Sequence, residues 1–217
     1  MQQLIISVLF GWSLGVLGTI GYEQYKRYID GKNLKTAILS ELKVLLPRLV
    51  LSYFLLIIES KECNKEKLQW VYDNLSLYED KAIASKILST KEKVKKLLKL
   101  DDASIKSTIA TLAEESGVEH IKSITLSFGK ESITNFSLLS EEIRLIIFDV
   151  RTKINILNEL ADRIDFFFKQ TFSTGLSSKN SEIIDNNIKS NYVVYFEHSK
   201  LVVERIKEIF ELEKKHK

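Results

Sequence analysis

Residues 140–172, SEEIRLIIFDVRTKINILNELADRIDFFFKQTF, carry the clearest folding signal in the 217-residue chain. Apolar side chains recur there at intervals of three and four residues, as they do on one side of an α-helix. They are Ile143, Ile146, Ile147, Val150, Ile154, Leu157, Leu160, Ile164 and Phe168. Ser140 is a preferred N-cap residue, and the carboxylates of Glu141 and Glu142 favour a first helical turn. The stretch therefore predicts one long helix, from just after Ser140 to about Phe172.

The same spacing returns from Ser181 to near the end of the chain, in Ile184, Ile188, Tyr192, Tyr195, Val202, Ile206, Ile209 and Leu212. A short loop around Gly175 separates the two stretches. Two long helices joined by a short loop pack antiparallel, so residues 140–217 are predicted to form a long helical hairpin. The run Phe166–Phe168 covers more than one side of the first helix. We expect it to be buried against further elements, with a partner site as the alternative.

Helix-breaking residues are scarce in the chain. It has one proline, Pro47, and eight glycines, of which four fall within the first 21 residues. Sheets joined by tight turns usually need more of both residues, whereas long helices need almost none. The composition therefore predicts an all-α fold.

Residues 33–117 are predicted to form a first helical part, with Asn33 as its N-cap. The further helices expected in it are, in order, residues 65–78, residues 79–100, and a short helix that is capped by Asp101 and Asp102 and ends at Gly117. Residues 118–139 show the weakest helical pattern and are predicted to be a less regular connector with room for a brief β-strand. This connector divides the first helical part from the hairpin.

The segment Met1–Tyr22 contains no charged residue. Its predominantly apolar part, Leu4–Tyr22, has 19 residues and as a helix spans roughly 28 Å, close to the hydrocarbon thickness of a bilayer. We therefore predict that residues 1–22 form a transmembrane anchor. A cleaved signal peptide is the alternative, but the segment lacks the basic start and the A-x-A site of such peptides.

Basic residues follow this apolar segment and none precedes it. Residues 23–32 form a basic juxtamembrane segment with Lys26, Arg27 and Lys32, and Lys35 lies just beyond. The positive-inside rule then predicts an N-terminus outside the membrane and a main domain in the cytoplasm.

Small residues recur on one side of the predicted anchor. Ser7, Gly11, Gly15 and Gly18 lie on a common helical face, where small side chains let the backbones of two membrane helices approach closely. We interpret this face as a self-association seam. The alternative is that it packs on another segment of the same chain.

Residues 44–58 are a second apolar stretch, but they are short and include Pro47 and Arg48. A buried core helix, or a helix lying in the membrane interface, fits that length and charge better than a second transmembrane segment. A second transmembrane segment at residues 44–58 is the less favoured alternative.

No pattern typical of a catalytic or nucleotide-binding site is present. The sequence lacks a phosphate-binding loop, a dinucleotide fingerprint, HExxH and G-x-S-x-G, and its one cysteine and three histidines are far apart. A net charge of +3 is too balanced for a typical nucleic-acid-binding domain. The lysines of residues 79–100 are interpreted as a solvated face, with membrane-surface contact as the second interpretation. We therefore expect no enzyme activity, cofactor, metal or small-molecule substrate.

The architecture of the chain resembles that of small bacterial membrane effectors. It combines a membrane span with a face of glycines, a basic segment directly after the span, and a helical domain rich in lysine and isoleucine. These effectors are encoded beside anti-phage modules of the retron and abortive-infection types. The resemblance implies a protein that a protein or ribonucleoprotein partner keeps silent through the cytoplasmic domain. On infection it would compromise the inner membrane. The alternative function is a membrane-tethered helical adaptor that recruits a partner without harming the membrane.

Overall fold

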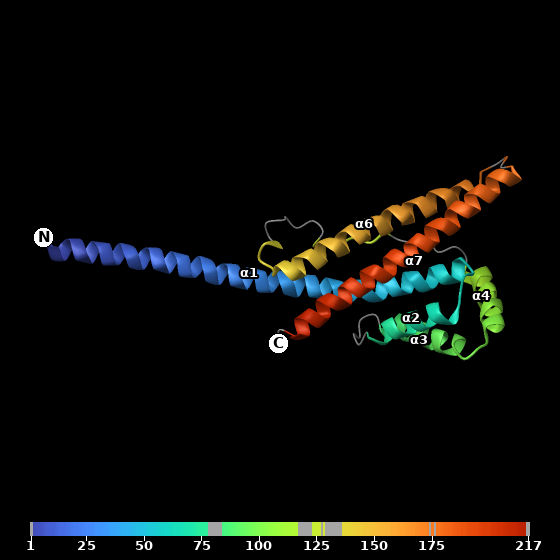
Figure 1. The fold of residues 1–217 in the computed structure, drawn as a ribbon, viewed down its shortest axis with the longest axis horizontal. Coiled ribbons are helices and arrows are strands. Elements are labelled where there is room, and N and C mark those ends of the chain that lie inside the picture. The colour runs from blue at the N-terminus through green and yellow to red at the C-terminus, as the bar shows by residue number, and fades with distance from the viewer. Residues whose placement is uncertain are drawn as a thin grey trace.

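The computed structural model of the chain describes residues 2–77, 84–116, 123–126, 128, 136–173, 175 and 177–215; the side chains of residues 2–13, 84 and 114–116 lie outside the description. Its α-helices, shown in Figure 1, are α1 (Gln2–Glu59), α2 (Lys65–Ser76), α3 (Ala84–Leu97), α4 (Asp102–Ser116), α6 (Glu141–Gln170) and α7 (Ser178–Lys215). Within these described ranges no residue belongs to a β-strand. The prediction of an all-α fold is confirmed.

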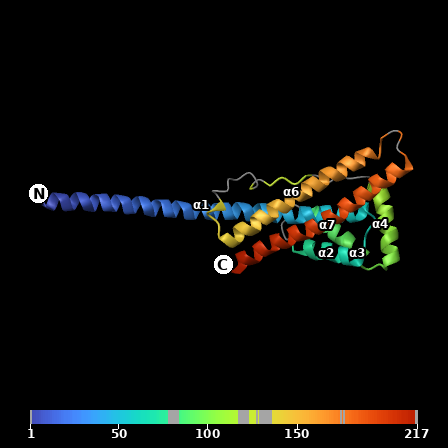
Figure 2. The same cartoon turned by 45° about the horizontal axis from the view of Figure 1, so that its top comes forward.

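The predicted hairpin is present as α6 and α7, which lie side by side in both Figure 1 and Figure 2. Helix α6 begins directly after Ser140, whose backbone has the extended ψ of 150° expected of an N-cap, although its side chain makes no capping hydrogen bond. Helix α7 begins at Ser178, three residues before the predicted start, and the Asn180 amide donates to Ser177 Oγ at 3.3 Å. A side-chain cap slightly upstream thus moves the start of α7.

Helix α1 is one continuous helix of 58 residues, so the predicted helix start at Asn33 is wrong. Asn33 is an exposed residue inside α1. The reason is that residues 23–32 contain Glu, Gln, Lys and Arg but no proline, and a helix already formed on both sides propagates through such residues at little cost. The apolar N-terminal segment and the bundle therefore share a single helix.

The second half of α1 forms the centre of the bundle. Leu42, Leu49, Tyr53 and Ile57 are fully buried where α1 packs against α7 and α2. Residues 44–58 thus lie in the protein core, which is the interpretation that their length and charge favoured. Pro47 is buried within the helix, whereas Arg48 beside it is exposed.

Two contacts show that α7 runs antiparallel to α1. Near the end of α1, the Tyr192 hydroxyl donates to Glu59 Oε2 at 3.2 Å. Much earlier in α1, Lys35 Nζ lies 2.5 Å from Glu213 Oε2, close to the end of α7. The end of the chain accordingly lies beside the point where α1 enters the bundle (Figure 1).

Helices α2, α3 and α4 cover the other side of α1 (Figure 2). Asn64 caps α2, because its Oδ1 accepts from the Lys67 amide at 2.8 Å, and Asp101 Oδ1 accepts from the Ser104 amide at 2.8 Å before α4. The prediction that Asp101 caps this helix is confirmed. Two predicted helix ends, at Tyr78 and Gly117, lie outside the described residues. So do residues 79–83 and most of the connector 118–139.

Short described pieces of the connector are tied to the helices by side chains. Asn158 of α6 accepts from the Ile124 amide at 2.7 Å and donates to the Ile124 carbonyl at 2.9 Å. Glu41 of α1 accepts from the Phe128 amide at 3.2 Å. These polar side chains satisfy backbone groups that a strand would otherwise pair.

Gly31 marks the place where α1 enters the bundle. It is buried, and a Cβ atom added there would lie 2.9 Å from the carbonyl oxygen of Leu138, in the turn before α6. The obstacle is backbone, which cannot move aside as a flexible side chain does. Gly21, in the exposed part of the same helix, has nothing within 4 Å of its Cβ position.

We predict that Gly31→Ala lowers the free energy of unfolding by about 1–2 kcal/mol, because the clash outweighs the higher helix propensity of alanine. Thermal unfolding followed by circular dichroism measures this change. Gly21→Ala is the matched control, since it gains the same propensity without a clash. Equal stability of the two variants would show that the turn at Leu138 does not press on α1.

Candidate functional site

The first half of α1 projects beyond the rest of the molecule, as both Figure 1 and Figure 2 show. Every residue from Leu14 to Tyr28 is exposed, among them Leu14 at 62%, Leu17 at 65% and Ile20 at 48%. Large apolar side chains on a free helix lose the stabilisation that burial gives them in water. This projecting segment is therefore the part of the described molecule that most needs a further partner.

The projecting segment presents no unpaired polar side chain between Leu14 and Ile20. Its one hydroxyl, that of Thr19, donates to the Gly15 carbonyl at 2.9 Å, one turn back in the same helix. Where water is absent, serine and threonine hydroxyls hydrogen-bond in this way to a backbone carbonyl of their own helix. The segment is therefore apolar on all sides and fits apolar surroundings.

The predicted small-residue face lies partly in the described segment. Gly15 and Gly18 have nothing within 4 Å of their Cβ positions, so their side of α1 is open. The side chain of Ser7 and the surroundings of Gly11 lie outside the described part. At about 100° per residue, Val16 and Ile20 lie on the opposite side of the helix from these two glycines.

The four predicted juxtamembrane basic residues fall into two groups. Lys26, Arg27 and Lys32 are exposed, and their side chains make no ion pair with any residue that the structure describes. Lys35, by contrast, is half-buried in its ion pair with Glu213 of α7. Sequence spacing cannot separate the two groups, because the bundle begins between Gly31 and Lys35 and the partner of Lys35 comes from the far end of the chain.

A search of the described residues finds no helix that is both long enough and apolar enough to cross a membrane. The side chains of residues 1–13, which belong to the predicted anchor, lie outside the description.

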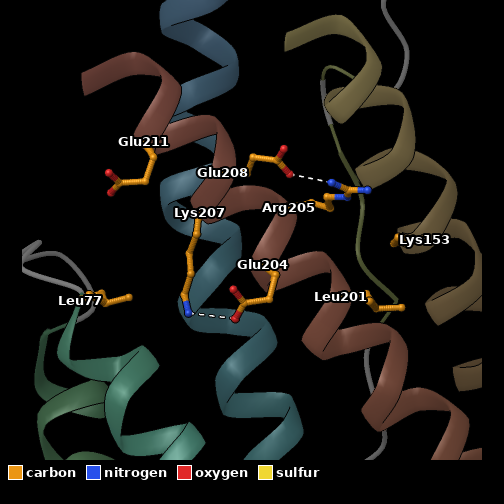
Figure 3. Close-up of a pocket in the computed structure, with 8 residues that line it drawn as sticks. All are labelled: Leu77, Lys153, Leu201, Glu204, Arg205, Lys207, Glu208 and Glu211. Carbon is orange, nitrogen blue, oxygen red and sulfur yellow. Dashed lines mark hydrogen bonds and ion pairs between the residues drawn. The ribbon is translucent and has the colours of Figure 1, made fainter. Parts of the chain in front are cut away.

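An open groove of about 720 Å³ lies between α7, α6 and the end of α2 (Figure 3). The residues that line it are Leu77, Lys153, Leu201, Glu204, Arg205, Lys207, Glu208 and Glu211. Its charges pair with one another or with neighbours: Lys207 contacts Glu204 at 3.0 Å, and Arg205 contacts Glu208 at 2.7 Å. A groove whose charges are already paired offers a ligand little electrostatic attraction.

Arg205 also joins the two helices of the hairpin. Its Nε lies 2.8 Å from Asp149 Oδ2 on α6, and Lys153 Nζ lies 3.1 Å from the other oxygen of the same carboxylate. Burial opposes ionisation of Asp149, but the hydrogen bonds from Lys153 and Arg205 outweigh it and lower the pKa of this carboxyl. The cluster therefore has a structural role between α6 and α7.

The aromatic run Phe166–Phe168 at the far end of the hairpin is only partly buried, so the predicted burial does not hold for Phe166. Phe166 is 57% exposed and Phe172 is 72% exposed, while Phe167 and Phe168 are half-buried. The physical reason is that the tip of the hairpin diverges from α1, so no third helix covers it (Figure 1, Figure 2). Phe167 and Phe168 still pack against the edge of the core, and neighbouring rings contact one another, with centroids 5.4 Å apart for Phe166 and Phe167.

Groups with metal-binding or nucleophilic chemistry are dispersed. Among the described residues, no three His, Cys, Asp or Glu side chains are close enough to hold a metal ion. Cys63 is buried, and burial raises the pKa of its thiol to about 11, although nearby Lys67 acts in the opposite direction. His198 is half-buried, and His120 and His216 lie outside the described residues. This distribution gives no basis for assigning a catalytic residue.

Compared with models of known protein families, with curated proteins and with solved structures, the chain matches none of them.

Arg205→Gln is predicted to lower the free energy of unfolding by at most about 1 kcal/mol, because its partners are partly solvated. A carboxyl with a lowered pKa stabilises the folded state above its unfolded pKa, near 3.9, and that stabilisation is lost as the pH falls through the lower folded pKa. The difference between wild type and variant should thus be constant at neutral pH and shrink below about pH 4. Urea unfolding at several pH values measures it.

Arg163→Gln is the control for this variant. Arg163 and Glu159 are 4.0 Å apart within α6, and both side chains are largely exposed. This control should change stability little at any pH. Equal effects of the two substitutions would contradict a connecting role for Arg205.

A second prediction concerns the projecting segment. Deleting residues 1–22 should leave the melting temperature of the bundle unchanged, because the described side chains of that segment are not buried against the bundle. The same deletion should reduce self-association in water, because it removes the exposed apolar surface of Leu14–Ile20. Differential scanning calorimetry and sedimentation measure the two effects. A lower melting temperature would show that the segment packs on the bundle in solution.

Proposed function

We propose that residues 1–22 span the bacterial inner membrane as a single helix, with the N-terminus outside and the helical bundle in the cytoplasm. The observation that carries this proposal is the exposed, apolar segment Leu14–Ile20, whose only hydroxyl is satisfied within the helix. The uncharged run from Met1 to Tyr22 supplies the length that a bilayer needs. Exposed Lys26, Arg27 and Lys32 support the orientation.

We further propose that the protein is the membrane effector of an anti-phage defence system of the retron or abortive-infection type. In this proposal, copies associate through Ser7, Gly11, Gly15 and Gly18 and compromise the membrane when released. The open space at Gly15 and Gly18 supports such a seam, since small residues allow close helix approach.

The position of the bundle is compatible with this seam. Gly31, which faces Leu138 of the bundle, follows Gly18 by 13 residues in the same helix. At about 100° per residue, this separation places Gly31 on roughly the opposite side of α1 from Gly18. The bundle therefore leaves the small-residue face accessible to a second copy.

Control by a protein or ribonucleoprotein partner is assigned to the bundle. Phe166 and Phe172 are exposed and lie near or just after the C-terminal end of α6, which is at the end of the molecule opposite the N-terminus (Figure 1). Exposed aromatic side chains of this kind are typical anchors of protein interfaces. The same observation supports the alternative function, a tethered adaptor that recruits a partner through the bundle and leaves the membrane intact.

The effector and the adaptor differ in what they require of the membrane helix. We predict that full-length wild type, expressed in bacteria, depolarises the inner membrane and that Gly15→Leu/Gly18→Leu abolishes this effect at equal membrane level. Leucine side chains on this face hold the backbones of two helices apart. Membrane potential, read with a voltage-sensitive dye, and colony counts are the measurements.

Val16→Leu/Ile20→Leu is the matched control, since it adds no polarity and changes the opposite side of the helix. It should depolarise cells as wild type does. Depolarisation by the glycine variant at the wild-type level would contradict the seam. No depolarisation by any of the three proteins would favour the adaptor.

A further inference from the structure

Three tyrosines follow the proposed span on the projecting part of α1. Tyr22 is 68% exposed, Tyr25 is 64% exposed and Tyr28 is 66% exposed. Tyrosine has an apolar ring and a polar hydroxyl, so it is most stable where hydrocarbon meets water. Nothing in the bundle covers these rings, and their spacing of three residues gathers them on one side of the helix.

Three positive charges are interleaved with these tyrosines. Lys26, Arg27 and Lys32 point to different sides of α1 at about 100° per residue, so positive charge surrounds the helix. None of the three side chains pairs with a residue that the structure describes, whereas Lys35, one turn beyond Lys32, is paired with Glu213. Of the first four basic residues of α1, the three that precede Lys35 are thus unpaired.

The dimensions of this part match those of a lipid headgroup layer. Tyr22 and Tyr28 are about 9 Å apart along the helix axis, and a bilayer has an interfacial layer of roughly 5–8 Å on each side of its hydrocarbon core. The bundle begins at Gly31, about 13 Å beyond Tyr22. The bundle therefore lies beyond the headgroup layer at Tyr22–Tyr28, and the long side chain of Lys32, which follows Gly31, reaches back along the helix to meet a headgroup.

We infer that Tyr22, Tyr25, Lys26, Arg27, Tyr28 and Lys32 form a collar that binds the phosphates of anionic phospholipids, with the tyrosine rings at the base of the headgroups. The inference rests on the proposed insertion of residues 1–22. Charge complementarity selects the ligand: the collar carries unpaired guanidinium and ammonium groups, which attract an anionic headgroup more strongly than a zwitterionic one. Glu23 and Asp30 reduce the net charge but leave it positive.

The test uses the full-length protein, captured on a resin in mild detergent and equilibrated with labelled phosphatidylglycerol and phosphatidylcholine. Each basic side chain near an anionic surface strengthens binding roughly fivefold. Lys26→Gln/Arg27→Gln/Lys32→Gln should therefore lower the retained ratio of phosphatidylglycerol to phosphatidylcholine at least about tenfold. Added salt should weaken the wild-type preference by screening.

The matched control is Lys93→Gln/Lys95→Gln/Lys96→Gln, which removes the same charge from the exposed face of α3, far from the collar (Figure 1). This control should keep the wild-type lipid ratio. Equal ratios in wild type and the collar variant, or an equal loss in the α3 control, would overturn the collar.

Flotation with phosphatidylcholine vesicles at alkaline pH separates the collar from the anchor on which it depends. Wild type and both triple variants should float, because insertion comes from residues 1–22. Proteins that float but show no preference for phosphatidylglycerol would overturn the collar alone. A wild-type protein that stays at the bottom of the gradient would overturn the anchor and the collar together.

Discussion

The packing of α1 against α7 and α2 is the constraint on which the rest of the structure depends. It buries Leu42, Leu49, Tyr53 and Ile57 completely and thereby fixes the direction in which the first half of the helix leaves the bundle. Because α1 is unbroken from Gln2 to Glu59, the core and the projecting segment belong to one continuous helix. In the proposed membrane insertion, a rotation of the bundle would be passed along this one helix to the small-residue face.

Two environments are thus combined in one helix. From Ile38 onward, α1 has one side for the protein core and another for water, and its charged residues Glu41, Lys43 and Arg48 avoid full burial. From Leu14 to Ile20 it has no charged residue and no contact with the bundle, and Thr19 satisfies its own hydroxyl. An uncharged exposed segment next to a well-packed core is costly in water, and lipid removes that cost without any new protein contact.

Local periodicity was enough to predict the hairpin, because the stripe from Ile143 to Ile164 depends only on helical spacing. The continuity of α1 was not predictable, because Gly31 followed by Asn33 looks like a helix boundary in the sequence. The structure gives a different reason for the glycine, since the carbonyl of Leu138 occupies the space beside Gly31. The exposure of Phe166 depends on where the hairpin tip diverges from α1, and the separation of Lys35 from Lys26 and Arg27 depends on Glu213. Both are long-range facts without a local signal. The glycine face and the run of basic residues after it were visible in the sequence because each lies within one helix.

Cysteine labelling in cells tests the central claim, that lipid surrounds the projecting segment, most directly. Cys63 is the only cysteine, and both its burial and its pKa of about 11 keep its reaction with maleimides slow. Leu17→Cys is compared with Ser85→Cys, which places a thiol on the exposed surface of α3. A membrane-impermeant maleimide should label neither variant in intact spheroplasts. After detergent-free lysis it should label Ser85→Cys alone, with Leu17→Cys protected until detergent dissolves the bilayer. Labelling of Leu17→Cys as fast as Ser85→Cys in the detergent-free lysate would contradict the account.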